Sequence, residues 1–127
     1  MNKRIILTAS FLGALGVVLG AFGAHGLREH INPASLDIWK KGVEYQFYHV
    51  FALLYLSTFA RYKNKLIGFS FMFFTLGIIL FSGSLYILAL KDVHHWPIRF
   101  VGPITPIGGL CFILGWISLF LAALKDK

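Results

Sequence analysis

Residues 66–90, LIGFSFMFFTLGIILFSGSLYILAL, contain no charged side chain and decide the fold class of this chain. At about 1.5 Å per residue, a helix of this length exceeds the roughly 30 Å of hydrocarbon in a bilayer. A lipid interior offers no water to backbone amides and carbonyls, so an apolar segment of this kind must form a helix there. The stretch therefore predicts a transmembrane helix that is tilted or extends beyond the hydrocarbon.

Three further apolar blocks accompany this stretch. Of the 127 residues, 57% are hydrophobic and 13% are charged, whereas about a quarter of the residues in soluble domains are charged. Continuous blocks of about twenty apolar residues are typical of membrane spans rather than of soluble cores. We therefore predict an all-α, four-helix transmembrane bundle that forms a single integral membrane domain over residues 1–127, with spans at about 5–24, 43–60, 66–90 and 104–124.

The first block also has features of a secretory signal peptide. Lys3 and Arg4 precede an apolar core, and small residues follow it at 21–24. Because the apolar run of about twenty residues exceeds the core of a usual signal peptide, we expect an uncleaved first span. Cleavage as a signal peptide is the alternative, and the intact mass of the purified protein distinguishes the two.

Lysine and arginine residues set the expected orientation, because positive side chains resist translocation across the membrane. Seven of the 12 lie in the N-terminal flank, the loop at 61–65 and the C-terminal tail, and five lie on the opposite side. We therefore expect both termini in the cytoplasm. The net charge of +7 forms no basic stripe, so the sequence predicts contact with the lipid bilayer and not with nucleic acid.

Residues 32–41 link the first two expected spans. Pro33, followed by Leu36, Ile38 and Trp39, indicates a short amphipathic helix that lies at the outer membrane surface before the second span begins. Aromatic side chains with a polar edge are enriched at membrane interfaces. We therefore expect an interfacial belt made of Trp39, Tyr45, Tyr48 and Trp96.

Small residues form one stripe on the first span and another on the fourth. They recur at three- and four-residue spacing, which places them on one face of a helix that turns by about 100° per residue. Helices in lipid approach most closely where small residues meet, so these stripes predict packing faces rather than the walls of a pore or a cofactor site. The predicted helix-packing glycines are Gly13, Gly16, Gly20, Gly23, Gly108 and Gly115.

Polar side chains gather in and around the second and third spans. Gln46 and His49 share a face with Gly42 on the second helix, and three hydroxyl side chains share a face with Gly68 on the third. Such groups either join helices by hydrogen bonds or bind a ligand. The predicted polar cluster consists of His25, Glu44, Tyr45, Gln46, His49, Thr75, Ser82 and Tyr86.

The sequence offers little chemistry beyond this cluster. No two histidines have the i and i+4 spacing of helical metal ligands, and Cys111 is the single cysteine. The chain also lacks a G-x-S-x-G elbow, a phosphate-binding glycine loop and an H-E-x-x-H motif. We therefore predict no catalytic residues, no metal site and no cofactor.

Four motifs resemble those of a known family. They are GAFGAHGL at 20–27, GVEYQFYH at 42–49 after Trp39, LFSGSLY at 80–86 and PIGGLCFILGW at 106–116. On these motifs the chain resembles the domain of unknown function 423, also called uncharacterised protein family 0382, a family of small membrane proteins with about four spans. The resemblance covers nearly the whole chain and implies the fold, and with it we expect the chain in a bacterial inner (plasma) membrane. It implies no activity and supplies no catalytic residues.

The sequence therefore predicts a small polytopic membrane protein that is not an enzyme. We expect a non-catalytic accessory protein, scaffold or subunit that uses its glycine faces for contact, either as a homo-oligomer or within a larger membrane complex. One alternative is a small oligomeric carrier or channel lined by the polar cluster around Gln46 and His49, although carriers usually place broken helices around a midplane site. A weaker alternative is a protein or enzyme that binds lipid headgroups.

Overall fold

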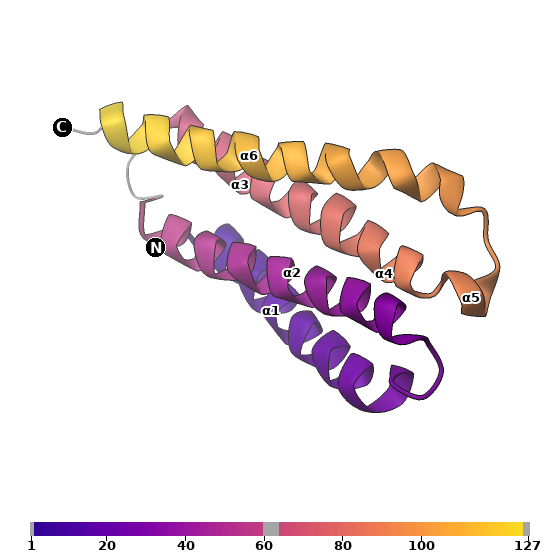
Figure 1. Cartoon of the computed structure of the whole chain (residues 1–127). Helices are drawn as coiled ribbons and strands as arrows, with labels where there is room; N and C mark the ends of the chain where they lie inside the picture. Colours follow the sequence, from indigo (N-terminus) through magenta and orange to yellow (C-terminus); the bar gives the residue numbers. More distant parts are fainter. Residues whose placement is uncertain (1, 60–63, 126–127) are drawn as a thin grey trace.

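The computed structural model describes residues 2–59 and 64–125, and all regular structure within these ranges is helical. Four long helical segments run antiparallel, so the start of α1 and the end of α6 lie at the same end of the molecule (Figure 1). This arrangement confirms the predicted all-α, four-helix bundle. The elements are α1 (Lys3–Phe22), η1 (Gly23–Leu27), α2 (Pro33–Phe59), α3 (Lys65–Gly77), η2 (Ile78–Ser82), α4 (Gly83–Ala89), α5 (Lys91–His94), η3 (Ile98–Phe100) and α6 (Val101–Lys125).

Three of the four segments are long and apolar enough to cross a membrane. They are Lys3–Leu27, Lys65–Ala89 and Ile98–Lys125. The helix α2 has sufficient length at 27 residues, but Glu44, Gln46 and His49 lower its mean hydropathy. A membrane protein with three apolar helices is therefore evident, and the assignment of α2 as a fourth span stays a prediction.

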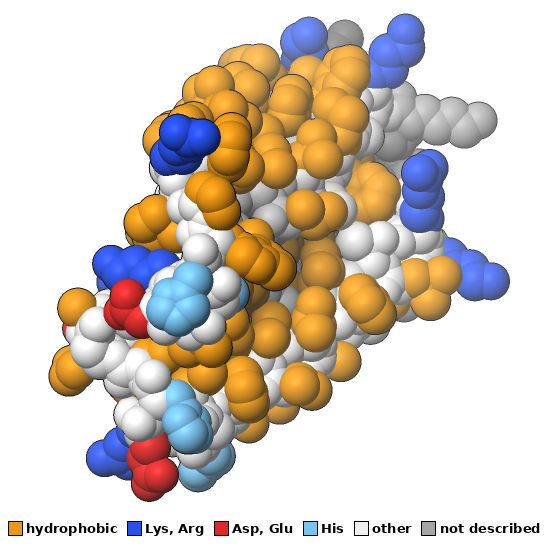
Figure 2. Space-filling model, turned by 90° about the vertical axis from the view of Figure 1, so that its right-hand side faces the viewer, with side chains coloured by type: hydrophobic (Ala, Val, Ile, Leu, Met, Phe, Trp, Pro, Cys, Tyr) orange, Lys and Arg blue, Asp and Glu red, His pale blue; other side chains and the backbone are white. Residues whose placement is uncertain are grey.

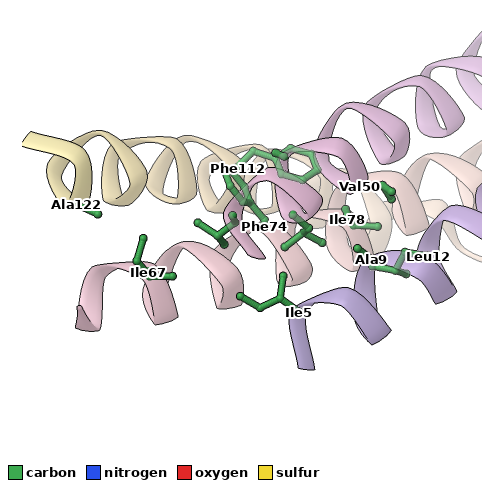
Figure 3. Close-up of a cluster of buried hydrophobic side chains, with 12 residues drawn as sticks. Ile5, Ala9, Leu12, Val50, Ile67, Phe74, Ile78, Phe112 and Ala122 are labelled. Atoms are coloured by element: carbon green, nitrogen blue, oxygen red, sulfur yellow. The ribbon is translucent and has the colours of Figure 1, made fainter. Parts of the chain in front are cut away.

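The helices pack as two pairs that meet along α2. In one pair α1 lies against α2, and in the other α6 lies against α3 and η2, while α2 also contacts η2 and α4 (Figure 1). Buried apolar side chains from all four segments form one cluster, which includes the fully buried Leu53 and Phe74 (Figure 3). A second cluster, around Leu27, Trp39 and Ala89, lies near the end that carries the α1–α2 connection.

The helix α2 begins where the sequence predicted a separate surface helix. The Oδ1 atom of Asn32 accepts a hydrogen bond from the Ser35 amide at 2.8 Å, and Pro33 is the first helical residue, a common arrangement at a helix start. From there α2 continues unbroken to Phe59. The prediction of a separate amphipathic helix is therefore wrong, because residues 33–41 form the first turns of α2 and bury Ser35 and Trp39 against the bundle.

The third helical segment, which runs from α3 through η2 to α4, contains a π-helical turn, here called the wide turn. This turn changes which face of the segment lies against each neighbouring helix. The backbone of the segment is α-helical in α3, π-helical in η2 and α-helical again in α4. A π-helical turn holds about one residue more than an α-helical turn, so it rotates the following face by roughly a quarter turn. The predicted single hydroxyl face is therefore wrong. Ser82 donates to α2, whereas Thr75 donates to the Phe71 carbonyl of its own helix at 2.8 Å.

Candidate functional site

A buried glutamine joins three helical segments. Gln46 of α2 is 1% exposed, and its Nε2 donates a hydrogen bond to the Leu12 carbonyl of α1 at 2.7 Å. Its Oε1 accepts a hydrogen bond from the Tyr86 hydroxyl of α4 at 2.6 Å. Both ends of the amide are thus paired with helices that lie far from α2 in the sequence.

Two further bonds continue this contact toward the α1–α2 connection. The Ser82 hydroxyl of η2 donates to the Gly42 carbonyl of α2 at 2.7 Å, and Trp39 Nε1 donates to the Leu19 carbonyl of α1 at 2.9 Å. The rings of Trp39 and Tyr86 lie 4.7 Å apart between their centroids. Together with Gln46 these residues form what we call the polar seam, defined as Trp39, Gly42, Gln46, Ser82 and Tyr86.

Glycine at position 42 makes this arrangement possible. A Cβ atom at Gly42 would lie 2.7 Å from Cε1 of Tyr86 and 3.3 Å from the Ser82 carbonyl. Because the glycine has no side chain, the Tyr86 ring can cross α2 closely enough to reach Gln46. The small residue therefore sets the geometry of the seam.

His49 lies one turn after Gln46 and faces α6. Its Nε2 accepts a hydrogen bond from Trp116 Nε1 at 3.1 Å, and its Nδ1 lies 2.8 Å from the Tyr45 carbonyl. An indole N–H can only donate, so Nε2 carries no proton and Nδ1 must donate to that carbonyl. The ring stacks on Phe112 with centroids 3.6 Å apart. His49 is thus fixed as a neutral imidazole with both nitrogen atoms paired, and Tyr45 takes part through its backbone.

Three members of the predicted polar cluster lie apart from the seam. His25 is exposed in η1. Glu44 is half-exposed, forms an ion pair with Lys41 at 3.7 Å and accepts a hydrogen bond from the Tyr48 hydroxyl. Thr75 precedes the wide turn η2, and its hydroxyl donates to the Phe71 carbonyl of its own helix. The structure therefore brings together Gln46, Ser82 and Tyr86, with His49 and Tyr45 beside them.

The six predicted packing glycines all lie against a neighbouring helical segment of the same chain. A Cβ atom at Gly23 would lie 2.5 Å from the Trp39 ring, and one at Gly108 would meet the backbone of Phe81 in η2. Small residues at these positions let the backbones approach closely. The other four glycines make similar contacts: Gly13 faces Val50, Gly16 faces Phe47, Gly20 faces Val43 and Gly115 faces Phe74. The glycine faces are therefore occupied by residues of the same chain.

Sequence reasoning missed two tryptophans of this region. Trp39 was expected in the interfacial belt, but it is 3% exposed and lies in the seam, whereas Tyr48 and Trp96 are 51% and 65% exposed. Trp39 lies three residues before Gly42 and seven before Gln46, which places all three on one helical face. The helical periodicity of the sequence could therefore have assigned Trp39 to this face. Trp116 follows no such pattern, and its contact with His49 depends on how α6 packs.

Two serines outside the predicted cluster join α6 to the third segment. Ser70 donates to the Gly115 carbonyl at 2.9 Å, and Ser84 shares a hydrogen bond with Thr105 at 2.6 Å. Within residues 2–59 and 64–125, every buried side-chain nitrogen and oxygen has a hydrogen-bond partner. In the same ranges, no group of three histidine, cysteine, aspartate or glutamate side chains is arranged to hold a metal ion. Among these polar groups, Gln46, Ser70 and Ser82 connect helices to one another.

Known proteins are similar to this chain along nearly its whole length. The family described as "Protein of unknown function (DUF423)" matches residues 19–109. A UPF0382 membrane protein of Staphylococcus epidermidis is 42% identical over 97% of both chains. The UPF0382 membrane protein YwdK of Bacillus subtilis is 40% identical over 97% of this chain and 98% of its own. The UPF0382 inner membrane protein YgdD of Escherichia coli is 36% identical over 99% of this chain and 93% of its own. No solved structure matches the chain.

Proposed function

The chain belongs to the DUF423 family of membrane proteins, and on that premise we propose that it is a non-catalytic subunit or scaffold of a membrane assembly. The assembly contains either further copies of this chain or other membrane proteins. We place the chain in the bacterial inner membrane with both termini in the cytoplasm. The distribution of lysine and arginine supports this orientation, and the relative YgdD is named an inner membrane protein.

The observation that carries this proposal is the complete pairing of the buried polar side chains within the described residues. A catalytic or transport site needs donors or acceptors that remain open to a substrate. Here both ends of Gln46 and the hydroxyl of Tyr86 are already bonded across helices. The two nitrogens of His49 are also paired, one with Trp116 of α6 and the other with the Tyr45 carbonyl of its own helix. Groups paired in this way rigidify a bundle and fix its packing, which suits a structural component.

The same packing limits which surfaces are available to a partner. The glycine stripes of α1 and α6 lie against α2, α3 and η2, so an assembly contact must use other faces. The outer face of α1 exposes Phe11 and Val18, and the outer face of α6 exposes Ile113 and Phe120. These surfaces meet lipid in a monomer and adjoin neighbouring chains in an assembly.

A flux measurement separates this proposal from a carrier or channel. Purified protein is reconstituted in liposomes, and ion and proton flux is compared between the wild type and Gln46→Leu. Thr75→Val is the matched control, because its hydroxyl is bonded within its own helix. We expect no flux from any of the three. A flux in the wild type that Gln46→Leu abolishes without unfolding the protein would contradict the scaffold proposal.

An enzyme that acts on lipid headgroups is tested with the same liposomes. Mass spectrometry of the extracted lipids should show the same composition before and after incubation. Lipid turnover that depends on the protein would refute the non-catalytic assignment. Extraction in mild detergent gives the positive test, in which we expect a complex larger than one chain.

A further inference from the structure

A groove opens on the bundle surface between the start of α1 and the outer face of α3. Its volume is about 400 Å³, which lies within the roughly 300–1,000 Å³ of small-molecule sites. The hydroxyl of Thr75 is bonded to the Phe71 carbonyl, so the lining beyond the single arginine is mostly carbon. The lining residues are Arg4, Gly68, Phe71, Met72, Thr75 and Leu76.

The length of this groove matches one leaflet of a bilayer. The residues that α3 contributes follow a single stripe from Gly68 to Leu76, which is about 12 Å at 1.5 Å per residue. Half of the hydrocarbon thickness is about 15 Å. The groove therefore has the length of an acyl chain segment within one leaflet, and it is too short to receive a whole membrane-crossing helix.

Arg4 lines the groove, and its side chain is exposed. Its Cζ lies 5.8 Å from the centroid of the Phe71 ring, which orients the guanidinium over α3. Among the described residues, the guanidinium makes no hydrogen bond or ion pair. An arginine fork suits a phosphate group, because its N–H donors match two oxygen atoms at once.

The charge of this end of the bundle favours an anionic ligand. The described cations here are Lys3, Arg4, Lys65 and Lys125, whereas the described acids lie toward the opposite end, at Glu29, Asp37, Glu44 and Asp92. Figure 2 views the molecule from that opposite end, where red side chains lie near the viewer among blue and pale blue ones, while blue side chains without red ones are visible at the distant end. Each lysine or arginine near an anionic lipid surface adds to its attraction.

From this groove and this charge we propose that the chain binds one anionic phospholipid between α1 and α3. An acyl chain lies along Gly68, Met72 and Leu76, and the headgroup phosphate accepts hydrogen bonds from Arg4. Gly68 faces the open space of the groove, because a Cβ atom added there would meet nothing within 4 Å. The site is separate from the polar seam, so the proposal does not depend on the function proposed above.

Native mass spectrometry of the full chain in detergent tests the proposal. Dioleoyl phosphatidylglycerol is titrated against dioleoyl phosphatidylcholine, which has the same acyl chains but no net charge. We expect one phosphatidylglycerol to bind about fivefold more tightly than phosphatidylcholine. Arg4→Gln should remove this preference, whereas Arg28→Gln, at the other end of the bundle, should keep it.

A second pair of variants tests the groove itself. Gly68→Leu fills the groove and should weaken the binding of both lipids. Gly83→Leu is the matched control, because a Cβ atom there also meets nothing within 4 Å and Gly83 does not line the groove. Thermal unfolding is recorded for every variant to confirm that each one is folded. Equal affinity of the wild type for the two lipids would overturn the proposal, as would equal losses from Arg4→Gln and Arg28→Gln or unchanged binding to Gly68→Leu.

Discussion

Replacing Gln46 by leucine removes the side chain that connects α1, α2 and α4. The variant loses the donor to the Leu12 carbonyl and the acceptor of the Tyr86 hydroxyl. Leucine has a similar size and no polar atom, so the change removes hydrogen bonds and leaves the packing volume nearly intact. Tyr86→Phe is the complementary variant, because it removes the hydroxyl and leaves the ring that packs against Gly42 and Trp39.

The expected loss follows from these two bonds. Hydrogen bonds between helices in lipid contribute about 0.6 kcal/mol each, and a buried hydroxyl left without a partner costs roughly 1–3 kcal/mol. We therefore expect Gln46→Leu to lower the free energy of unfolding by about 2 kcal/mol and Tyr86→Phe to lower it by about 1 kcal/mol. The double variant leaves neither partner unpaired, so its loss should be smaller than the sum of the two single losses.

Unfolding in mixed micelles of dodecyl maltoside and increasing sodium dodecyl sulfate, followed by circular dichroism, measures these free energies. Thr75→Val is the control and should change stability by less than about 0.5 kcal/mol, as expected for a site away from the seam. If Gln46→Leu lowers the free energy of unfolding by no more than Thr75→Val does, the polar seam does not hold the bundle together. Strict additivity in the double variant would show that Gln46 and Tyr86 do not interact.

Three further predictions concern neighbouring contacts. Gly108→Ala should lower the free energy of unfolding by at least about 1 kcal/mol, because its Cβ would meet the backbone of η2, whereas Gly109→Ala, with only distant neighbours, should not. Equal effects at the two positions would contradict the observed register. Trp39→Phe should lower the free energy of unfolding by at least about 1 kcal/mol in the same assay, since a smaller phenyl ring replaces the buried indole and the bond to α1 is lost. An unchanged stability would argue against that bond. Nitrogen-15 NMR should show a proton on Nδ1 of His49 and none on Nε2, and the opposite tautomer would exclude the bond from α6.

The sequence was sufficient to predict the helices and most of their packing faces. The block at 66–90 is expected to be helical in lipid because a single apolar segment of this length satisfies its backbone groups within itself only as a helix. The glycine stripes of α1 and α6 likewise indicated contact faces, and Gly16, Gly23 and Gly108 do lie against neighbouring helices. The partner of each stripe could not be predicted, because spacing identifies a face and not the helix that covers it.

Two features could not be predicted for physical reasons. The wide turn η2 separates Thr75 from Ser82, and no residue type between them demands a π-helical turn. Such a turn arises from the packing of the whole segment, so a uniform periodicity of 3.6 residues assigned both hydroxyls to one face. Trp39 was misplaced because a tryptophan near the end of an apolar block is usually interfacial, whereas here its Nε1 finds a buried carbonyl of α1.

The most direct measurement of the structural role is native mass spectrometry of complexes extracted from membranes in mild detergent. The wild type is compared with Gln46→Leu/Tyr86→Phe, in which the central hydrogen bond of the seam is replaced by apolar groups. We predict the same complex for both chains, with a mass greater than that of one copy, because the seam holds the helices within each chain. A wild type recovered only as a single chain would contradict the proposed role as a subunit or scaffold.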